Sequence, residues 1–343
     1  MTVKKYILKE MIKMKKIISL LLVFAIVFAF AACNTTNNEE ETTTEAPYQS
    51  ITMRVAGLSG PTGIGMVNLM QSKDNQTAKN DYQFSVVSDP TEIVSGMTNN
   101  SYDIAACPIN LAATLYNKLE GNIQILAVNT KGVLYILENG NTINSLSDLA
   151  GKKLYATGQG STPEYILNYL LEKSGIADKV TVEYVTSHDE LATLAASGKA
   201  TISMLPEPKV TAALTKNADL RIALNLTEEF EKISGKTLIQ GVIIAKKDFV
   251  EANKAAIDMF LTEYEASINL ANTDIPSAAA LCEQYGIIPK AAVAQKAIPN
   301  CNIAYIDGAD MKASVSANLQ IFFDANPKSI GGKLPGDDFY YGV

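Results

Sequence analysis

The feature that most constrains the fold is an approximate internal repeat of strand, turn and helix. Residues 51–58 predict a strand, which is followed by a turn of Ser, Gly, Pro and Thr at 59–63 and by an apolar helical pattern. About 100 residues later, 153–157 predict another strand, followed by a Gly-Gln-Gly-Ser-Thr-Pro turn at 158–163 and a helix over 164–173. Because the order of turn residues recurs as well, we favour two related units over chance repetition of an ordinary α/β motif.

The next units of the two copies also correspond. In each copy a strand precedes a capped helix start, and a further strand ends at a proline: 84–88, 103–107 and Pro108 in the first, and 182–186, 201–205 and Pro206 in the second. Alternating strands and helices predict sheets covered by helices on both faces. The expected fold class is therefore α/β, with two lobes that each contain a mainly parallel sheet, joined by a two-strand hinge.

Other strand patterns predict how the chain passes between the lobes. Strands at 123–128 and 133–137 would carry it into the second lobe, and 238–245 would carry it back. Most of the later helical patterns are assigned to the first lobe, at 248–271, 276–285, 290–298 and 309–325. The expected lobe boundaries are 49–131 and 247–343 for the first lobe, and 132–246 for the second.

The N-terminus predicts an export signal. Residues 1–16 carry a net charge of +5, and the next 16 residues are apolar and uncharged. This run is shorter than the about 20 residues of a membrane-spanning helix, so we prefer a signal peptide over 1–33 to a transmembrane anchor. Phe30-Ala31-Ala32-Cys33 resembles a bacterial lipoprotein box, although Phe30 stands where Leu is usual. Cys33 is therefore the expected lipidation site, and ordinary cleavage nearby is the alternative. The true start is Met1, Met11 or Met14, and 34–48 predict a flexible tether.

Composition excludes several classes of partner. The whole chain has a net charge of −7, and subtracting the +5 of its basic start leaves −12. An acidic body argues against nucleic acid and against anionic membrane surfaces. The cysteines show no C-x-x-C spacing and the chain has one His, so no metal site is expected. Cys282 and Cys301 either form a disulfide outside the cell or remain buried thiols, which we favour.

Candidate binding residues follow from the predicted sheets. Ligands of open α/β sheets bind beyond the carboxyl ends of the strands, where Gly-rich turns lead into helix N-termini that suit an anionic group. The residues expected there are Ser59, Gly60, Thr62, Ser88, Asp89, Pro108 and Asn110 in the first lobe, and Thr157, Gly158, Gln159, Gly160, Ser161, Thr162 and Glu207 in the second. Glu207 is the carboxylate that could meet a cationic or hydroxylated group. The alternative is that these residues cap helices for folding reasons alone.

The sequence does not show the residue combinations that enzymatic catalysis usually requires. Neither a phosphate loop nor a Gly-x-Gly-x-x-Gly motif follows a strand, and His188 is interpreted as a solvent-facing neighbour of a helix cap. Arg54 and Arg221 are the chain's two arginines, and both lie in strand patterns, which disfavours a bidentate Arg clamp. Trp is absent, which disfavours an aromatic cage. We expect a monomeric binding protein without a cofactor and without enzymatic activity.

Several motifs together suggest a family. The lipoprotein box, Ser-Leu-Ser-Asp-Leu-Ala-Gly-Lys-Lys at 145–153, the turn at 158–163 and Leu-Pro-Glu-Pro at 205–208 resemble the nitrate/sulfonate/taurine-type solute-binding proteins of ABC importers. That group includes thiamine-pyrimidine synthase-like proteins and has the type II periplasmic-binding-protein fold. The resemblance extends over about residues 50–340. It implies a sulfonate, nitrate-like or pyrimidine ligand in the cleft between the lobes. It also implies a membrane permease with a cytosolic ATPase as partners, and a location on the outer face of the cell membrane.

Two alternatives remain at this stage. The enzymatic branch of the same group is a pyrimidine synthase that uses a Lys-bound pyridoxal phosphate, an active-site His and a cysteine cluster. This sequence has no cysteine cluster, and its single His lies outside the first lobe's turns. The other alternative is a receptor ectodomain or adhesin that uses the same cleft to sense a ligand.

Overall fold

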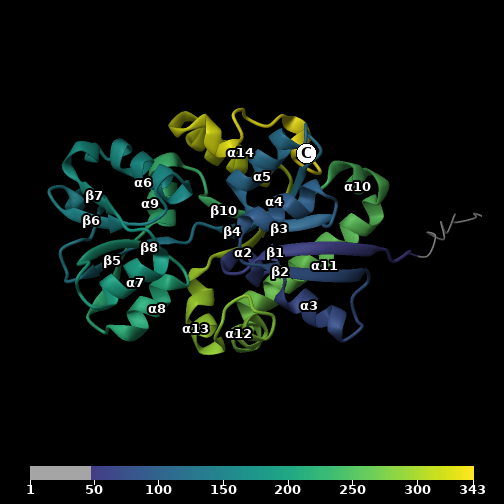
Figure 1. Ribbon diagram of the computed structural model, residues 1–343, viewed down its shortest axis with the longest axis horizontal. Helices are drawn as coiled ribbons and strands as arrows, with labels where there is room; N and C mark the ends of the chain where they lie inside the picture. The colour runs from purple at the N-terminus through teal and green to yellow at the C-terminus, as the bar shows by residue number, and fades with distance from the viewer. Residues whose placement is uncertain (1–47) are drawn as a thin grey trace, which may run out of the picture. The chain divides into compact units, whose positions relative to one another are not determined.

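The computed structural model describes residues 48–343, so the predicted signal peptide, Cys33 and nearly all of the tether lie outside the described residues. Residues Gln49–Val343 form one compact unit. Within it the strands form two sheets, of which the first has six strands in the order β11-β4-β10-β3-β1-β2 and the second has five in the order β7-β6-β8-β5-β9 (Figure 1). No helix in the described part of the chain is both long and apolar enough to cross a bilayer.

The strands lie close to the predicted ranges. The first sheet contains β1 (Thr52–Leu58), β2 (Asp81–Val87), β3 (Ile104–Pro108), β4 (Gln124–Lys131), β10 (Ile239–Ala245) and β11 (Ile303–Ile306). The second sheet contains β5 (Leu134–Asn139), β6 (Lys153–Ala156), β7 (Thr181–Tyr184), β8 (Ile202–Pro206) and β9 (Leu220–Asn225). The two-lobed α/β fold is therefore confirmed.

Helices cover both faces of each sheet, because apolar side chains alternate across the strands and need burial on both sides. On the first sheet, one face packs against α4 (Pro90–Thr98), α5 (Ile109–Lys118) and α14 (Gly308–Ala325). Its other face packs against α2 (Pro61–Ile64), α3 (Val67–Asp74), α11 (Lys254–Thr273), α12 (Ile275–Gln284) and α13 (Ala291–Ala297). On the second sheet, α6 (Thr162–Lys173) and α9 (Leu226–Ser234) cover one face, and α7 (His188–Ala196) and α8 (Lys209–Lys216) cover the other.

Both sheets are mixed, whereas the sequence pattern predicts mainly parallel ones. Strand β1 is parallel to β2 and β3, but β10 is antiparallel to β3 and β4, and β5 is antiparallel to β8 and β9. The register explains the difference. Leu134 at the start of β5 pairs with Pro206 at the end of β8, and Gly241 near the start of β10 pairs with Pro108 at the end of β3. A chain that crosses between lobes enters the new sheet at the edge where the parallel strands end. It must therefore run antiparallel to those strands.

The return strand corrects one predicted boundary. Strand β10 belongs to the first sheet, although the prediction assigned all of 132–246 to the second lobe. The outgoing and returning crossovers lie side by side, since the N–H of Gly132 donates to the carbonyl of Leu238 at 2.8 Å. A Cβ atom on Gly132 would lie 2.3 Å from Thr227 Oγ1 and 2.6 Å from Leu238 Cδ2. A larger residue at this position would therefore have to displace the side chains of Thr227 and Leu238.

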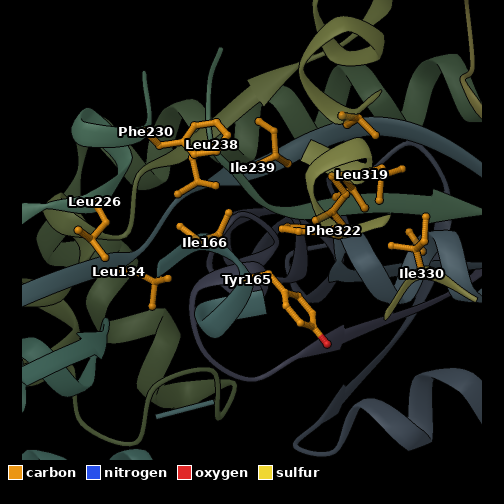
Figure 2. Packing of buried hydrophobic residues seen from close by; sticks show 14 of the residues in the cluster. Leu134, Tyr165, Ile166, Leu226, Phe230, Leu238, Ile239, Leu319, Phe322 and Ile330 are labelled. Atoms are coloured by element: carbon orange, nitrogen blue, oxygen red, sulfur yellow. The ribbon is translucent and has the colours of Figure 1, made fainter. Parts of the chain in front are cut away.

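Apolar packing also joins the lobes beside the crossovers. Figure 2 shows part of one continuous cluster that combines Tyr165, Ile166 and Phe230 of the second lobe with Leu319 and Phe322 of α14. The rings of Tyr165 and Phe322 have centroids 6.3 Å apart. Nearby, Asn326 Nδ2 donates to the Tyr165 hydroxyl at 3.2 Å.

Candidate functional site

A cleft of about 460 Å³ lies between the lobes. The first lobe contributes Leu58, Ser59, Gly60, Pro61, Thr62, Ser88, Pro90, Pro108, Gln240, Gly286, Ile287 and Pro289, and the second, with the crossover, contributes Val133, His188, Pro206, Glu207, Pro208 and Lys209. The volume is that of a small-molecule site. A groove of about 650 Å³ between α6 and α14 is larger, but apart from Gly160 it is lined by residues of these two helices and by Asn326, directly after α14. We therefore take the interlobe cleft as the candidate site.

The carboxyl ends of strands from both sheets form this cleft. Strands β1, β2 and β3 end at Leu58, Val87 and Pro108, and β8 ends at Pro206. The turn after β1 is held by two backbone hydrogen bonds, from Ser59 N–H to Val87 O at 2.9 Å and from Gly60 N–H to Ile287 O at 2.8 Å. The cleft thus lies where open α/β sheets place their ligands.

The structure brings together part of the predicted set. The predicted residues that line the cleft are Ser59, Gly60, Thr62, Ser88, Pro108 and Glu207. The predicted residues that do not line it are Asp89, Asn110, Thr157, Gly158, Gln159, Gly160, Ser161 and Thr162. Whether any of them contacts a ligand remains a prediction.

Two of the residues outside the cleft have local structural roles. Asp89 caps α4, because its Oδ1 accepts from the N–H and hydroxyl of Thr91, both at 2.8 Å. These hydrogen bonds lower the pKa of Asp89. Asn110 lies in the first turn of α5, where its carbonyl accepts from the hydroxyl of Thr114 at 2.9 Å.

The Gly-rich turn of the second lobe is also engaged locally. Ser161 Oγ donates to Gly158 O at 2.6 Å, and Gly160 N–H donates to Glu164 Oε2 at the same distance. Gly160 lines the groove between α6 and α14 instead of the cleft. Gln159 is exposed and Thr162 is buried.

His188 reaches the cleft, whereas we expected it to face solvent. It is the first residue of α7, with Ser187 as the N-cap, and its ring is half-buried. Its Nδ1 lies 2.6 Å from the hydroxyl of Thr157, which is 1 % exposed. This contact with the buried Thr157 fixes the orientation of the His188 ring. Burial, together with the charge of Lys209, lowers the pKa of His188, so the neutral ring predominates near pH 7.

Lys209 is the cation that lines the cleft. It begins α8 and pairs with Asp189 Oδ1 at 2.5 Å. Its side chain is 33 % exposed, and that of Asp189 is 80 % exposed, so this ion pair faces water and holds Lys209 only loosely. The two arginines are engaged elsewhere, Arg54 with Asp103 and Arg221 with Glu138.

Glu207 is the buried carboxylate of the cleft and is 2 % exposed. Its Oε2 accepts from Thr211 N–H at 3.1 Å, and its Oε1 accepts from the Thr211 hydroxyl at 3.0 Å and from Asn300 Nδ2 at 3.2 Å. Burial raises the pKa of Glu207, and these donors partly offset that effect. Among residues 48–343, no Lys, Arg or His forms an ion pair with it.

Several lining residues were not predicted from the sequence. Gln240 and the loop residues Gly286, Ile287 and Pro289 come from the return strand and from the segment after α12. Neither segment belongs to the internal repeat, so the repeat could not indicate them. Lys209 directly follows the predicted Leu-Pro-Glu-Pro motif and was within reach of the same reasoning.

Cys107, Cys282 and Cys301 are buried free thiols, as we favoured for Cys282 and Cys301. Burial raises the pKa of the Cys107 thiol, which lies at the end of β3. A neutral, buried thiol is a poor nucleophile. Cys107 therefore contributes to packing in this structure.

Comparison with known proteins agrees with this architecture. The family profile described as "ABC transporter, phosphonate, periplasmic substrate-binding protein" matches residues 75–296. An ABC transporter protein from Parabacteroides distasonis has a similar structure, with a TM-score of 0.71, 25% identity, and coverage of 84% of this chain and 98% of that one. No curated protein sequence matches the chain.

Two sulfonate-binding proteins share the fold. The periplasmic aliphatic sulphonate binding protein SsuA from Escherichia coli gives a TM-score of 0.67 at 16% identity, covering 83% of this chain and 96% of that one. A putative periplasmic sulfonate-binding SsuA from Methylobacillus flagellatus gives 0.58 at 16% identity, covering 81% and 87%. These likenesses show the type II binding-protein fold that the sequence resemblance implies.

The predicted function is confirmed at the level of the family. The profile match spans more than half of the chain, and it is that of the phosphonate group, whereas the motifs suggested the nitrate, sulfonate and taurine group. A substrate-binding component of this kind has a small-molecule ligand, and its partners are a membrane permease and an ATPase. The chain belongs to the phosphonate family of periplasmic substrate-binding proteins and is the extracytoplasmic substrate-binding component of an ABC transporter.

Proposed function

We propose that this protein captures a small organic phosphonate or sulfonate in the interlobe cleft and delivers it to its permease. The observation that carries the proposal is that His188 and Lys209 of the second lobe line the same cleft as the turns with Ser59 and Ser88 in the first lobe. Phosphonate and sulfonate groups are both tetrahedral oxyanions, and the matched family and the sulfonate-binding neighbours support this class. We also propose that the protein performs no chemistry on the ligand.

The anionic group would lie between His188 and the turns of the first lobe. When the Thr157 hydroxyl donates to Nδ1 of His188, Nε2 carries the proton of the neutral ring and is the donor available to a ligand in the cleft. Helix α5 starts at Pro108 without a side-chain cap, so the N–H groups of its first turn also favour an anion. Ser59 and Ser88 are exposed at the cleft and add hydroxyl donors.

The other end of the ligand would meet Glu207. A buried carboxylate with neutral partners favours a ligand that brings a cation or a strong hydrogen-bond donor. The cleft therefore suits a zwitterion, such as an amino-substituted phosphonate or sulfonate, better than a simple anion. Nitrate and neutral pyrimidines would use one end of the site alone.

Titration calorimetry of the protein with a small panel tests this function. The panel contains ethylphosphonate, 2-aminoethylphosphonate, ethanesulfonate, 2-aminoethanesulfonate, nitrate and an aminopyrimidine. We expect binding of the phosphonates or sulfonates, and a ligand at 100 times its Kd would stabilise the fold by about 2.7 kcal/mol. Selective binding of nitrate or of the pyrimidine would overturn the proposed class.

The affinity for ethanesulfonate should rise as the pH falls. An anion next to His188 favours its protonated form and raises a pKa that is low in the free protein. Affinity is then highest below the free-state pKa and is lost as the pH rises through the bound-state pKa. The sulfonate keeps its charge between about pH 5 and pH 8, so the change reports on the protein.

His188→Gln should flatten this pH profile and weaken binding by about tenfold. Calorimetric titrations at several pH values measure both effects. The matched control is Lys216→Gln at the exposed end of α8, which should leave the profile unchanged. A profile that keeps its slope in His188→Gln would remove His188 from the anion site.

We further propose that the protein is a monomer anchored through lipid on Cys33, as the lipoprotein box predicts. Labelling of cells with a radioactive fatty acid should mark the wild-type chain. Cys33→Ser should lose the label and leave the membrane fraction. Labelling of the Cys33→Ser chain would contradict the anchor.

A further inference from the structure

Asn300 of the first lobe makes two hydrogen bonds to the second lobe. It ends the short helix η3 (Ile298–Asn300), which lies between α13 and β11. Its carbonyl accepts from the hydroxyl of Tyr135 at 2.7 Å, and its Nδ2 donates to Glu207 Oε1 at 3.2 Å. Tyr135 lies on β5 and Glu207 directly follows β8, so both partners belong to the second lobe.

The two bonds are enclosed by the protein. Tyr135 is 3 % exposed and Glu207 is 2 % exposed, and the neighbouring Cys301 is fully buried. Thr211, the other residue that donates to Glu207, belongs to the second lobe itself. Asn300 is therefore the first-lobe donor to the Glu207 carboxylate among the described residues.

The backbone beside Asn300 is fastened to the crossover. Asn302 Nδ2 donates to Gly132 O at 2.6 Å, and Lys131 N–H donates to Asn302 O at 3.0 Å. Any rotation of the second lobe about this crossover moves Glu207 relative to Asn300, because Asn300 is tied to the first lobe's side of the hinge. The hydrogen bond between Asn300 and Glu207 thus depends on how the lobes are arranged.

We propose that Asn300 is a positioning residue that completes the Glu207 subsite from the opposite lobe, so that recognition of a donor group on the ligand is coupled to the arrangement of the lobes seen here. This inference rests on the proposed function and adds a residue and a coupling to it. Thr211 donates to both carboxylate oxygens, and Asn300 adds a second donor to Oε1, which leaves the second acceptor position of Oε2 for the ligand. Tyr135 in turn holds the Asn300 backbone in place.

The test compares two probes that differ by one ammonium group, 2-aminoethylphosphonate and ethylphosphonate. The full-length chain, kept in detergent, is titrated with each probe in the calorimeter. Asn300→Ala should lower the preference for the amino probe by about tenfold and change ethylphosphonate affinity by less than about twofold, because this variant removes a hydrogen bond to a charged group. Tyr135→Phe removes one oxygen atom and should lower the preference in the same direction by about threefold.

Tyr165→Phe is the matched control. It removes another tyrosine hydroxyl that joins the lobes, through Asn326, at a place away from Glu207. This variant should keep the preference, and circular dichroism confirms that each variant is folded. If Asn300→Ala does not fold, Tyr135→Phe alone decides.

Each other outcome contradicts a distinct statement. An equal loss for both probes in Asn300→Ala, or an unchanged preference, overturns the positioning role. A wild-type chain that binds both probes equally overturns this inference and leaves anion capture standing. A wild-type chain that binds neither probe, nor ethanesulfonate and its amino derivative, overturns the proposed function itself.

Discussion

Asp103→Ala should lower the free energy of unfolding by about 3–5 kcal/mol, because it leaves buried positive charge without its partner. The side chain of Asp103 is 4 % exposed and accepts from Arg54 N at 3.0 Å, Nε at 2.9 Å and Nη2 at 2.5 Å. Lys246 Nζ lies 3.9 Å from Asp103 Oδ1, and the Lys246 side chain is 8 % exposed. Without Asp103, Lys246 keeps the neutral partner Asn100 and no carboxylate within ion-pair distance among the described residues.

Urea denaturation measures this loss, and Asp81→Ala serves as its control. Asp81 lies on β2, which β1 separates from β3, is exposed and accepts from the hydroxyl of Thr52, so its removal should cost less than about 0.5 kcal/mol. Asp103 precedes β3 at the edge of the first sheet opposite the cleft, so the folded Asp103→Ala protein should keep its ligand affinity. A loss below about 1 kcal/mol would contradict the view that Asp103 compensates Lys246.

Glu207→Gln should weaken binding of 2-aminoethylphosphonate by roughly 10–100-fold and leave ethylphosphonate nearly unaffected. The variant keeps the size of the side chain and removes the negative charge that would meet the ammonium group. Competitive calorimetry with the two probes gives the ratio of affinities. Glu172→Gln, an exposed residue of α6 outside the cleft, is the matched control and should leave the ratio unchanged.

The same variant should change how stability depends on pH. Burial raises the pKa of Glu207 in the folded state, so its contribution to stability is fully present below the unfolded pKa and is lost as the pH rises through the folded pKa. The wild-type chain should therefore gain stability relative to Glu207→Gln as the pH falls through that window. Thermal melts across the acidic range measure the difference, and parallel curves would show that the carboxylate titrates normally.

Much of the fold was predictable because the internal repeat is a local signal. Apolar strands that end at Pro108 and Pro206, and helix starts capped by Asp89 and Ser187, lie where the pattern put them. Helix α9 and strand β11 were not predicted, whereas Arg221 of β9 was placed in a strand pattern. They lie outside the repeated units, and short segments such as β11, with four residues, carry too little periodicity to be recognised.

Sheet direction and lobe membership were beyond local patterns. Whether β10 pairs with the first or the second sheet depends on where the returning chain re-enters, and the same apolar segment satisfies either arrangement. At the crossover the returning chain is hydrogen-bonded to Gly132, where a Cβ atom would meet side-chain atoms of Thr227 and Leu238.

The candidate site was likewise only partly predictable from local sequence patterns. Turns at the ends of strands are local features, so the order of residues was enough to predict that Ser59, Ser88 and Glu207 would lie near a cleft. Folding of the whole chain was needed to turn His188 inward on Thr157, and to bring Asn300, nearly 100 residues after Glu207 in the chain, to the Glu207 carboxylate. The Asn300 contact depends on how the two lobes pack, and the His188 contact on how the segment after β6 packs against α7 within the second lobe. A hydrogen bond requires its two atoms to be placed within a few tenths of an ångström by elements far apart in sequence.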